Sequence, residues 1–510
     1  MKEKKRKRQE IDIIQGHLEE QAILEELLDE DRYEKPRRKK INPNKEYVHV
    51  TYLFVVLFLA MMGYIIYFTA VKSKDLINSP YNVRLNSMAE RVVRGDIVDN
   101  EGNILATTEV SDDGAERRVY PYGKMYAHVV GYDVNGKAGL ELSENFDLLT
   151  SSAFFIERII NQMKDEKNIG NTIVTTLDTD LQKTAYDALG NHDGAVVVMD
   201  ITTGKILTMV SKPSYTPGTV SKNWDKLVSH KESVLLNRAT QGAYAPGSTF
   251  KIVTTLEFMR ENADFSSYRY KCNGKIELEE DDTIIHCAGM TKHGKENLEE
   301  SLAYSCNTSY ANMALSLNRS SYKKTAEDLL FNKELPNVLA ENECKKSVFA
   351  VNNKTIDSEL MMTAIGQGET MVSPYHMTLI AAAIANGGVL MKPYVVSEVR
   401  NYKGVGIEKT KPMRYKKLMS SVEAAQLKTY MESVVLYGTG KSLAGKEYEV
   451  AGKTGTAEYS TTDKSKVHSW FMGLTNPDNP ELAIAVVIEG ADQSGARAIS
   501  VAEKVFEAYY

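Results

Sequence analysis

An uncharged apolar segment at residues 52–71 constrains this chain more than any other feature of its sequence. It has about the twenty residues that a helix needs to cross the hydrocarbon core of a bilayer. Tyr52 and Tyr67 stand near its ends, where interfacial tyrosines are typical. A cleaved signal peptide fits less well, because the segment starts far from Met1 and is too long for the apolar region of such a peptide. We therefore predict one transmembrane helix over residues 49–71.

Two basic clusters, at residues 4–8 and 37–40, predict the orientation of this helix. The second cluster directly precedes the apolar segment, so we expect residues 1–48 to be a cytoplasmic tail and Lys72 onward to lie outside the membrane. Apolar residues recur at helical spacing over 11–28 among acidic residues, so this part of the tail is either a helix or disordered. The net charge of −6 over 510 residues gives no reason to expect a nucleic-acid partner.

A serine and a lysine one helical turn apart, Ser248 and Lys251, are the strongest candidates for catalysis. Pro246 and Gly247 interrupt the chain before them, and apolar periodicity predicts a helix over 248–260. The lysine can take the proton of the serine if burial or a second cation lowers the lysine pKa. Backbone N–H groups at the helix start suit an oxyanion. The pair alone is a weak motif, because serine is a common N-cap and lysine a common surface residue.

Two later motifs strengthen this interpretation: Ser-Cys-Asn at 305–307 and Lys-Thr-Gly-Thr at 453–456. In an extended loop, the serine and the asparagine of the first motif point the same way and the cysteine points away. A Ser-x-x-Lys pair followed by such a triplet and a Lys-Thr-Gly strand marks penicillin-binding proteins and class A β-lactamases. The sequence therefore resembles the penicillin-binding transpeptidases.

The stretch at 94–106 looks like a β-hairpin that turns at 100–103. Its Arg-Gly-x-Ile-x-Asp, followed by a glycine turn and Leu-Ala, is similar to the juxtamembrane signature of class B penicillin-binding proteins. The resemblance implies a non-catalytic domain, here at 72–171, that positions the enzyme and meets partners. Its compact length resembles the penicillin-binding protein A type. Residues 119–122, 128–131 and 139–141 extend the match.

The order of predicted elements in residues 172–510 favours an α+β domain. A hairpin, then helices, then three strands and a last helix imply one antiparallel sheet with helices on both faces and an all-helical lobe, as in the penicillin-binding/β-lactamase-like fold. Trp470 is read as core, and 366–368 as a turn that resembles a family loop. Strands are predicted at 172–177, 194–200, 205–210, 449–457, 469–474 and 482–488, and helices at 154–165, 180–189, 248–260, 301–317, 375–386, 421–435 and 495–510.

The motifs imply four catalytic residues. Ser248 attacks a carbonyl and holds the acyl group, and Lys251 is the base. Lys453 supplies a second cation that helps to keep Lys251 neutral. Ser305 relays a proton between the lysines and the leaving amine.

The resemblance also implies four substrate-binding residues. Asn307 holds the base and binds the substrate backbone. Gly455 has no side chain, so a substrate strand can lie against it. Thr456 binds a terminal carboxylate, and its N–H joins that of Ser248 in an oxyanion hole. Thr454, from the same Lys-Thr-Gly-Thr motif, is the fourth predicted substrate-binding residue.

The resemblance implies a membrane-anchored D,D-transpeptidase that cross-links peptidoglycan stem peptides and is acylated by β-lactams. A membrane glycosyltransferase of the SEDS type and other wall-synthesis proteins are the expected partners, and no cofactor is expected. A D,D-carboxypeptidase, a β-lactamase, or a β-lactam sensor or scaffold remain as alternatives. We can place no base that would activate water for a β-lactamase, and no signalling domain for a sensor.

Four cysteines occur in the chain, and two of them, Cys272 and Cys287, enclose a short loop. Outside the membrane they could form a disulfide, or remain thiols in an anaerobic organism. His286 and His293 beside them raise the alternative of a zinc site. No tight Cys-x-x-Cys pair is present, so we expect no metal.

Overall fold

The computed structural model describes residues 15–25, 45–69, 77–78, 83–153, 155–279, 283–340, 343–459, 466–494 and 497–510. It divides into two units, Met1–Lys72 and Ser73–Tyr510. In the first unit, residues 15–25 are helical and exposed, so this part of the tail adopts the helical alternative. Helix α2 follows at Lys45–Tyr67. Its segment Tyr47–Tyr67 is long and apolar enough to cross a membrane, by length and composition; residues 70 and 71 of the predicted span lie outside the described residues.

A five-stranded antiparallel sheet forms the centre of the second unit, in the order β17-β18-β19-β7-β8. The chain contributes two strands before the mainly helical part and three after it, as predicted. Strand β17 is an edge strand, so one side of its backbone is not paired within this sheet. The strands are β7 Gly194–Asp200, β8 Ile206–Lys212, β17 Val450–Glu458, β18 Val467–Thr475 and β19 Leu482–Ile488.

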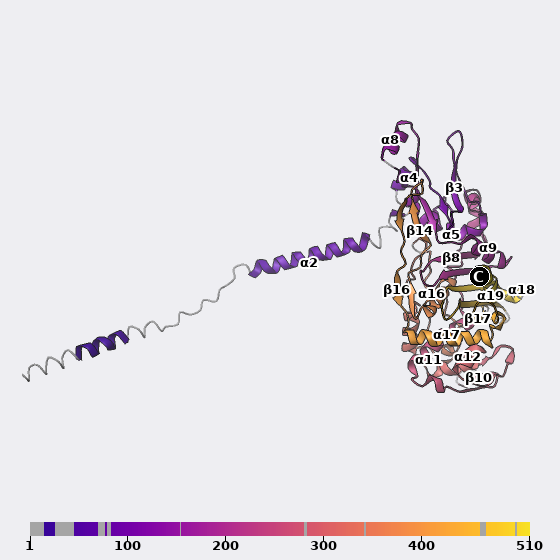
Figure 1. Cartoon of the computed structure of the whole chain (residues 1–510). Helices are drawn as coiled ribbons and strands as arrows, with labels where there is room; N and C mark the ends of the chain where they lie inside the picture. The colour runs from indigo at the N-terminus through magenta and orange to yellow at the C-terminus, as the bar shows by residue number, and fades with distance from the viewer. Residues whose placement is uncertain are drawn as a thin grey trace, which may run out of the picture. The chain divides into compact units, whose positions relative to one another are not determined.

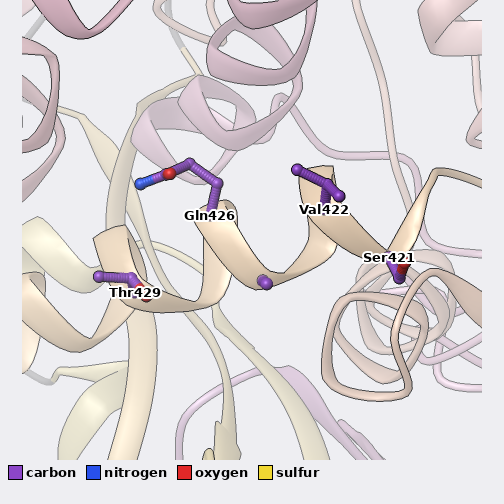
Figure 2. A pocket seen from close by; sticks show the side chains of 5 residues that line it. Ser421, Val422, Gln426 and Thr429 are labelled. Carbon is purple, nitrogen blue, oxygen red and sulfur yellow. The ribbon is translucent and has the colours of Figure 1, made fainter.

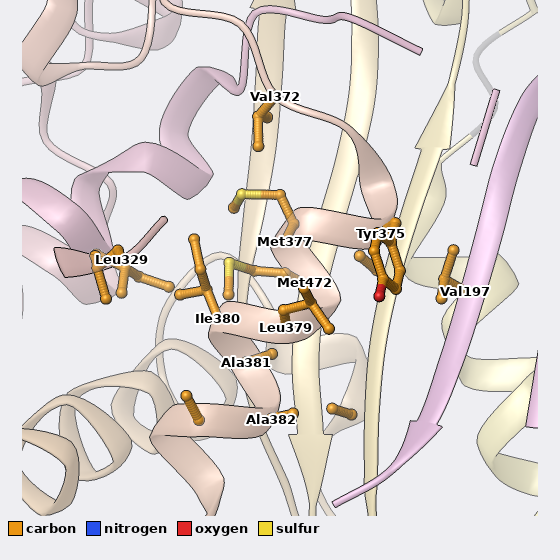
Figure 3. Close-up of a cluster of buried hydrophobic side chains, with 14 of the residues drawn as sticks. Val197, Leu329, Val372, Tyr375, Met377, Leu379, Ile380, Ala381, Ala382 and Met472 are labelled. Carbon is orange, nitrogen blue, oxygen red and sulfur yellow. The ribbon is translucent and has the colours of Figure 1, made fainter. Parts of the chain in front are cut away.

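Helices cover both faces of this sheet, as predicted. On one face, Val196 and Val198 pack with α9 (Thr179–Ala188) and α19 (Ala498–Tyr509). On the other face, Val197 points toward α16 (Pro374–Ala385), as Figure 3 shows. Every residue of α16 is buried, which explains why this helix is apolar all around. Helix α17 (Ser421–Leu436) lies beside β17 on that second face.

The lobe beyond α17 is mainly helical but not all helical, which corrects the prediction (Figure 1). It contains two small sheets of two antiparallel strands each, β10–β11 and β9–β12. The turn residues Asn273 and Gly274 and the β-branched run at 283–285 favour strands there. The elements of the lobe are α11 Lys251–Glu261, β9 Tyr270–Cys272, β10 Lys275–Leu278, β11 Thr283–His286, β12 Gly294–Glu296, α12 Leu298–Ala303, α13 Asn307–Ser316, α14 Arg319–Asp328 and α15 Asp357–Ala364.

A second sheet has the order β15-β14-β6-β2-β3-β4. The predicted hairpin at 94–106 forms β2 and the start of β3, and β6 lies parallel to β2. Strands β6, β14 and β15 come from the chain after residue 171, so this sheet contains strands from both sides of the predicted domain boundary. The boundary itself stays a prediction. The strands are β2 Ile97–Val98, β3 Ile104–Val110, β4 Glu116–Val119, β6 Thr172–Thr175, β14 Val396–Arg400 and β15 Gly406–Lys409.

The remaining elements are short. The predicted helix at 154–165 is α8, Phe155–Met163. The others are α4 Val83–Ala89, β1 Val92–Val93, η3 Gly123–Tyr126, α5 Ala127–Val130, α6 Gly139–Ser143, α7 Asn145–Leu148, β5 Asn168–Ile169, η4 Pro217–Thr219, α10 Val220–Val228, η5 Gly247–Phe250, η6 Phe265–Ser267, η7 Ala288–Met290, β13 Val389–Met391, β16 Arg414–Lys417, η8 Lys441–Leu443 and α18 Ala491–Ser494.

A buried ion-pair network joins parts of the juxtamembrane signature. Arg94 Nε lies 2.5 Å from Glu141 Oε2, and Arg118 Nε lies 2.7 Å from Glu141 Oε1. Burial alone would raise the pKa of Glu141, but the charges of Arg118 and Arg94 outweigh it and lower that pKa. Removing one partner of such a buried pair costs about 3–5 kcal/mol. In this chain the signature arginine therefore holds α6 against the β2–β3 hairpin.

Candidate active site

The nucleophile candidate Ser248 lies in η5, a tight turn that leads directly into α11. The helix predicted over 248–260 is thus present, with its first turn wound more tightly. Gly247 has φ of +55°, and a Cβ on it would lie 2.4 Å from the carbonyl oxygen of Thr456. Only glycine allows this turn to approach β17 so closely. Ser248 itself is half-buried, so a ligand can reach it.

Lys251 lies beneath the serine and is completely buried. Its Nζ is 3.0 Å from Ser248 Oγ. It also donates to Ser305 Oγ at 3.2 Å, to the Ser305 carbonyl at 2.9 Å and to Asn307 Oδ1 at 2.6 Å. The structure therefore brings together residues of two motifs that are more than fifty positions apart in the chain.

Both active-site lysines have lowered pKa values. Burial lowers the pKa of Lys251 to about 8. Lys453 is also completely buried. Burial, and then the charge of Lys251, lower the pKa of Lys453 well below its ordinary value. The main cause at Lys251 is thus burial, rather than the predicted charge of Lys453.

Ser305 occupies a sharp reversal between α12 and α13, so the prediction of one helix over 301–317 is wrong. Cys306 N–H donates to the Ser301 carbonyl at 3.0 Å and Ser305 N–H to the Leu302 carbonyl at 3.1 Å, a Schellman ending. Ser305 has φ of +57°, where glycine is usual. The left-handed conformation costs about 1–2 kcal/mol, and it places the Ser305 hydroxyl within hydrogen-bond distance of Lys251 Nζ.

Asn307 is the first residue of α13, so the triplet is not the extended loop that was predicted. Ser305 and Asn307 nevertheless both reach Lys251, and Cys306 points into the core, as expected. Asn307 Nδ2 donates to the carbonyl of His286 at 2.9 Å. This second hydrogen bond orients the amide so that its oxygen faces the lysine.

On β17, the residues after Lys453 differ in their surroundings. Thr454 is half-buried, with Oγ1 2.6 Å from Thr439 Oγ1, and Thr456 is exposed. A Cβ on Gly455 would lie 3.0 Å from both Thr249 Cγ2 and Trp470 Cβ. The close packing of Gly455 against Thr249 and Trp470 therefore favours glycine here, independently of the substrate contact that was predicted for it.

Trp470 is core, as predicted. Its indole is buried, and Nε1 donates to the Ala245 carbonyl at 3.1 Å. This hydrogen bond fixes the chain just before the nucleophile turn to β18.

The loop at 366–368 contributes more than the turn predicted from the sequence. Gly247 N–H donates to the Gly366 carbonyl at 2.8 Å. Gly366 has φ of +80°, and a Cβ there would lie 1.9 Å from the Gly247 carbonyl oxygen. The loop therefore supports the nucleophile turn from behind, and the Gly-x-Gly pattern was the available clue.

Of the two alternatives left open for Cys272 and Cys287, the structure has the thiols, and all four cysteines are free. Cys272 Sγ and Cys287 Sγ lie 3.7 Å apart. Sequence reasoning missed that Cys306, from the active-site triplet, lies 3.7 Å from Cys287 Sγ.

A pocket along α17 is separate from this site. Ser421, Val422, Ala425, Gln426 and Thr429 line it (Figure 2), and Val422 is 78% exposed. None of the predicted catalytic or substrate-binding residues contributes to its lining.

Comparison with known proteins places these observations in a family. The model of the penicillin-binding protein transpeptidase domain matches residues 194–510, and that of the penicillin-binding protein A dimerisation domain matches 94–173. Peptidoglycan D,D-transpeptidase PbpA of Mycolicibacterium smegmatis is 31% identical over 422 residues, covering 78% of this chain and 84% of that protein. PbpA of Mycobacterium tuberculosis H37Rv is 30% identical over 434 residues, covering 80% and 87%.

A solved structure agrees with these matches. Penicillin-binding protein A from M. tuberculosis, as an imipenem acyl-enzyme complex, superposes with a TM-score of 0.74 at 27% identity, covering 82% of this chain and 99% of that one. The chain belongs to the penicillin-binding protein transpeptidases.

Proposed function

We propose that this protein is a peptidoglycan D,D-transpeptidase in which Ser248 is the acylated residue. The observation that carries the proposal is the contact of a fully buried lysine, Lys251, with the serine hydroxyl at 3.0 Å. A neutral lysine amine at this distance accepts the hydroxyl proton as Ser248 Oγ attacks the carbonyl of a D-Ala-D-Ala terminus. The amide bond to the terminal D-alanine breaks, and D-alanine leaves with that proton. An amine from a neighbouring stem peptide then attacks the acyl carbon, the ester bond to Ser248 breaks, and Ser248 Oγ regains a proton from the amine.

The other predicted residues have assigned roles in these steps. Ser305 passes a proton toward the leaving amine, and the N–H groups of Ser248 and Thr456 stabilise the oxyanion. The open edge of β17 accepts the substrate as an added strand, with Asn307 on its other side. Lys453, Thr454, Gly455 and Thr456 form the β17 part of this site.

β-Lactams are proposed to acylate the same serine. The M. tuberculosis relative forms an acyl-enzyme with imipenem, which supports this step. To test the function, purified protein is incubated with a D-Ala-D-Ala stem peptide and an acceptor amine. Cross-linked product with released D-alanine is expected. Release of D-alanine by hydrolysis alone, at any acceptor concentration, would instead identify a D,D-carboxypeptidase.

The acylation rate is expected to depend on pH through Lys251. Only the neutral amine is a base, and the lysine pKa is about 8. The second-order rate constant for acylation by a penicillin should therefore be flat above that pH and fall about tenfold per unit below it. Stopped-flow measurements across this range provide the check. A rate that stays constant as the pH falls well below 8 would exclude Lys251 as the base.

We further propose that α2 anchors the protein in the cell membrane, with residues 1–48 in the cytoplasm and the catalytic domain outside. The apolar helix segment Tyr47–Tyr67 and the basic cluster that precedes it support this topology. In this arrangement 72–171 forms a juxtamembrane domain that meets a SEDS-type glycosyltransferase and other wall-synthesis proteins, and 172–510 is the transpeptidase domain.

Protease accessibility should reveal this topology. When protease is added to intact spheroplasts, the catalytic domain should be removed while an epitope tag at Met1 survives. Permeabilised spheroplasts, in which both ends are accessible, serve as the control. Loss of the tag in intact spheroplasts would contradict the proposed orientation.

A further inference from the structure

Four side chains outside the catalytic chemistry gather behind the Ser-Cys-Asn triplet: Cys272, Cys287, His293 and Cys306. Their three sulfurs and the histidine nitrogen all lie within 4.8 Å of one another. Cys272 ends β9, Cys287 follows β11, His293 directly precedes β12 and Cys306 directly precedes α13. The cysteines are buried and His293 is half-buried. The fold thus brings together metal-binding groups from segments that are not adjacent in sequence.

The separations of these atoms match the edges of a coordination tetrahedron. Zinc bonds of about 2.3 Å to sulfur and about 2.0 Å to nitrogen place two sulfurs about 3.8 Å apart, and a sulfur and a nitrogen about 3.5 Å apart. Cys287 Sγ lies 3.7 Å from both Cys272 Sγ and Cys306 Sγ. Cys272 Sγ lies 3.4 Å from His293 Nδ1. A disulfide would require about 2.05 Å and would leave the third sulfur unused.

Hydrogen-bond donors around the sulfurs favour their thiolate forms. Gly274 N–H points to Cys272 Sγ and Ser309 N–H to Cys306 Sγ, each at 3.4 Å. The Thr308 hydroxyl lies 3.3 Å from the sulfurs of Cys272 and Cys306. Such donors to ligand atoms orient and stabilise metal ligands. The cluster is therefore preorganised for a cation.

Two further observations are explained by a cation here. Cys306 is the N-cap of α13, a position at which serine, threonine, aspartate or asparagine is preferred. Glu296 is 1% exposed, and its carboxylate lies beside the Cys306 side chain. A cation nearby favours such a buried acid.

We propose that Cys272, Cys287, Cys306 and His293 bind one Zn²⁺ ion. Each cysteine releases its thiol proton to solvent, and the ion accepts an electron pair from each sulfur and from His293 Nδ1. A closed set of three thiolates and one imidazole is typical of a structural zinc site, with no open position for a substrate. His286, the other histidine considered from the sequence, is not among the ligands, because its side chain is not part of the cluster.

The zinc site would position the residues that contact the catalytic lysine. Cys306 lies between Ser305 and Asn307, which both contact Lys251. The amide of Asn307 also donates to the carbonyl of His286, next to the ligand Cys287. The ion therefore fixes two backbone segments. One contains Cys306, next to Asn307, and the other contains Cys287, next to the His286 carbonyl that Asn307 contacts. This consequence rests on the proposed function, whereas the metal site does not.

Metal analysis of the full-length protein, purified in detergent without chelators, tests the site. About one zinc ion per chain is expected by mass spectrometry. Cys272→Ala and His293→Gln should lose the metal, whereas the matched controls Cys344→Ala and His286→Gln should retain it. Because the first two variants remove ligands and so destabilise the lobe, His293→Cys provides a second test: a four-thiolate site should keep zinc. Cobalt-loaded protein should show sulfur-to-cobalt absorption bands that weaken in Cys272→Ala.

Three results would overturn the zinc site: wild-type protein without zinc, metal content unchanged in both ligand variants, or an oxidised pair among the three cysteines by thiol titration. A separate kinetic experiment tests positioning. Removing zinc with a chelator should slow penicillin acylation about 10- to 100-fold, and Zn²⁺ but not Mg²⁺ should restore it. An unchanged rate after zinc removal would refute positioning. If wild-type protein with bound zinc never reacts with penicillin, the proposed function fails and the metal site stands.

Discussion

Replacing Ser248 with alanine is expected to abolish covalent labelling by a fluorescent penicillin. Among the described residues, Ser305 is the other one whose hydroxyl contacts Lys251 Nζ, at 3.2 Å, and it lies in the reversal after α12 rather than on the half-buried turn. Loss of the attacking oxygen removes the covalent step itself, so the effect is complete rather than graded. Labelled protein on a denaturing gel gives the measurement.

The Ser248→Ala protein should still fold. Lys251 keeps its three contacts with Ser305 and Asn307, so the expected loss of stability is about 1 kcal/mol, seen as a small decrease in Tm. Ser316→Ala, which removes a hydroxyl bonded only to the Met313 carbonyl, is a control that should label normally. Labelling of folded Ser248→Ala protein would mean that the nucleophile lies elsewhere.

The second large effect is expected from Lys251→Arg. Arginine does not deprotonate at working pH, so the variant has no base and acylation should slow about 100- to 10,000-fold. Lys453→Arg is the matched comparison, because this lysine is equally buried. It places a permanent cation on β17, leaves Lys251 in place as the base, and should retain a measurable rate. The second-order rate constants for a penicillin, with Tm values for both variants, provide the check.

The pH profile of Lys453→Arg adds a diagnostic result. Burial and the charge of Lys251 lower the pKa of Lys453 well below its ordinary value, whereas an arginine at this position keeps its charge. An arginine there stays charged and disfavours the protonated form of Lys251, which should shift the acylation midpoint below about 8. Equal rates for the two variants, or a slower Lys453→Arg protein, would contradict this division of roles.

The sequence predicted local geometry well. The Ser-x-x-Lys spacing put a hydroxyl and an amine on one helical face, and Ser248 and Lys251 lie in contact. Short apolar runs placed the five strands of the central sheet, and caps and breakers placed most helices. These features depend on neighbours within a few positions, so the pattern along the chain contains the necessary information.

Most of the failures involve contacts between distant segments. The helix predicted at 301–317 is broken at Ser305, because the tertiary fold needs a left-handed residue there to direct its hydroxyl. Strand β14 joins the sheet of β2 and β6, although hundreds of positions separate it from them. The glycine at 366 proved to support the nucleophile turn. Such pairings depend on which edges and surfaces meet after folding.

The sequence by itself determined the chemical components: a nucleophile and base on one turn, a triplet, a lysine strand and an apolar segment long enough to span a membrane. Only the tertiary structure decided what surrounds them. It buried Lys251 and thereby lowered its pKa, and it gathered three cysteines and a histidine in one cluster, where the sequence had left a disulfide or free thiols open. The reason is that desolvation and ligand geometry arise from groups far apart in the chain, whose distances no local pattern specifies.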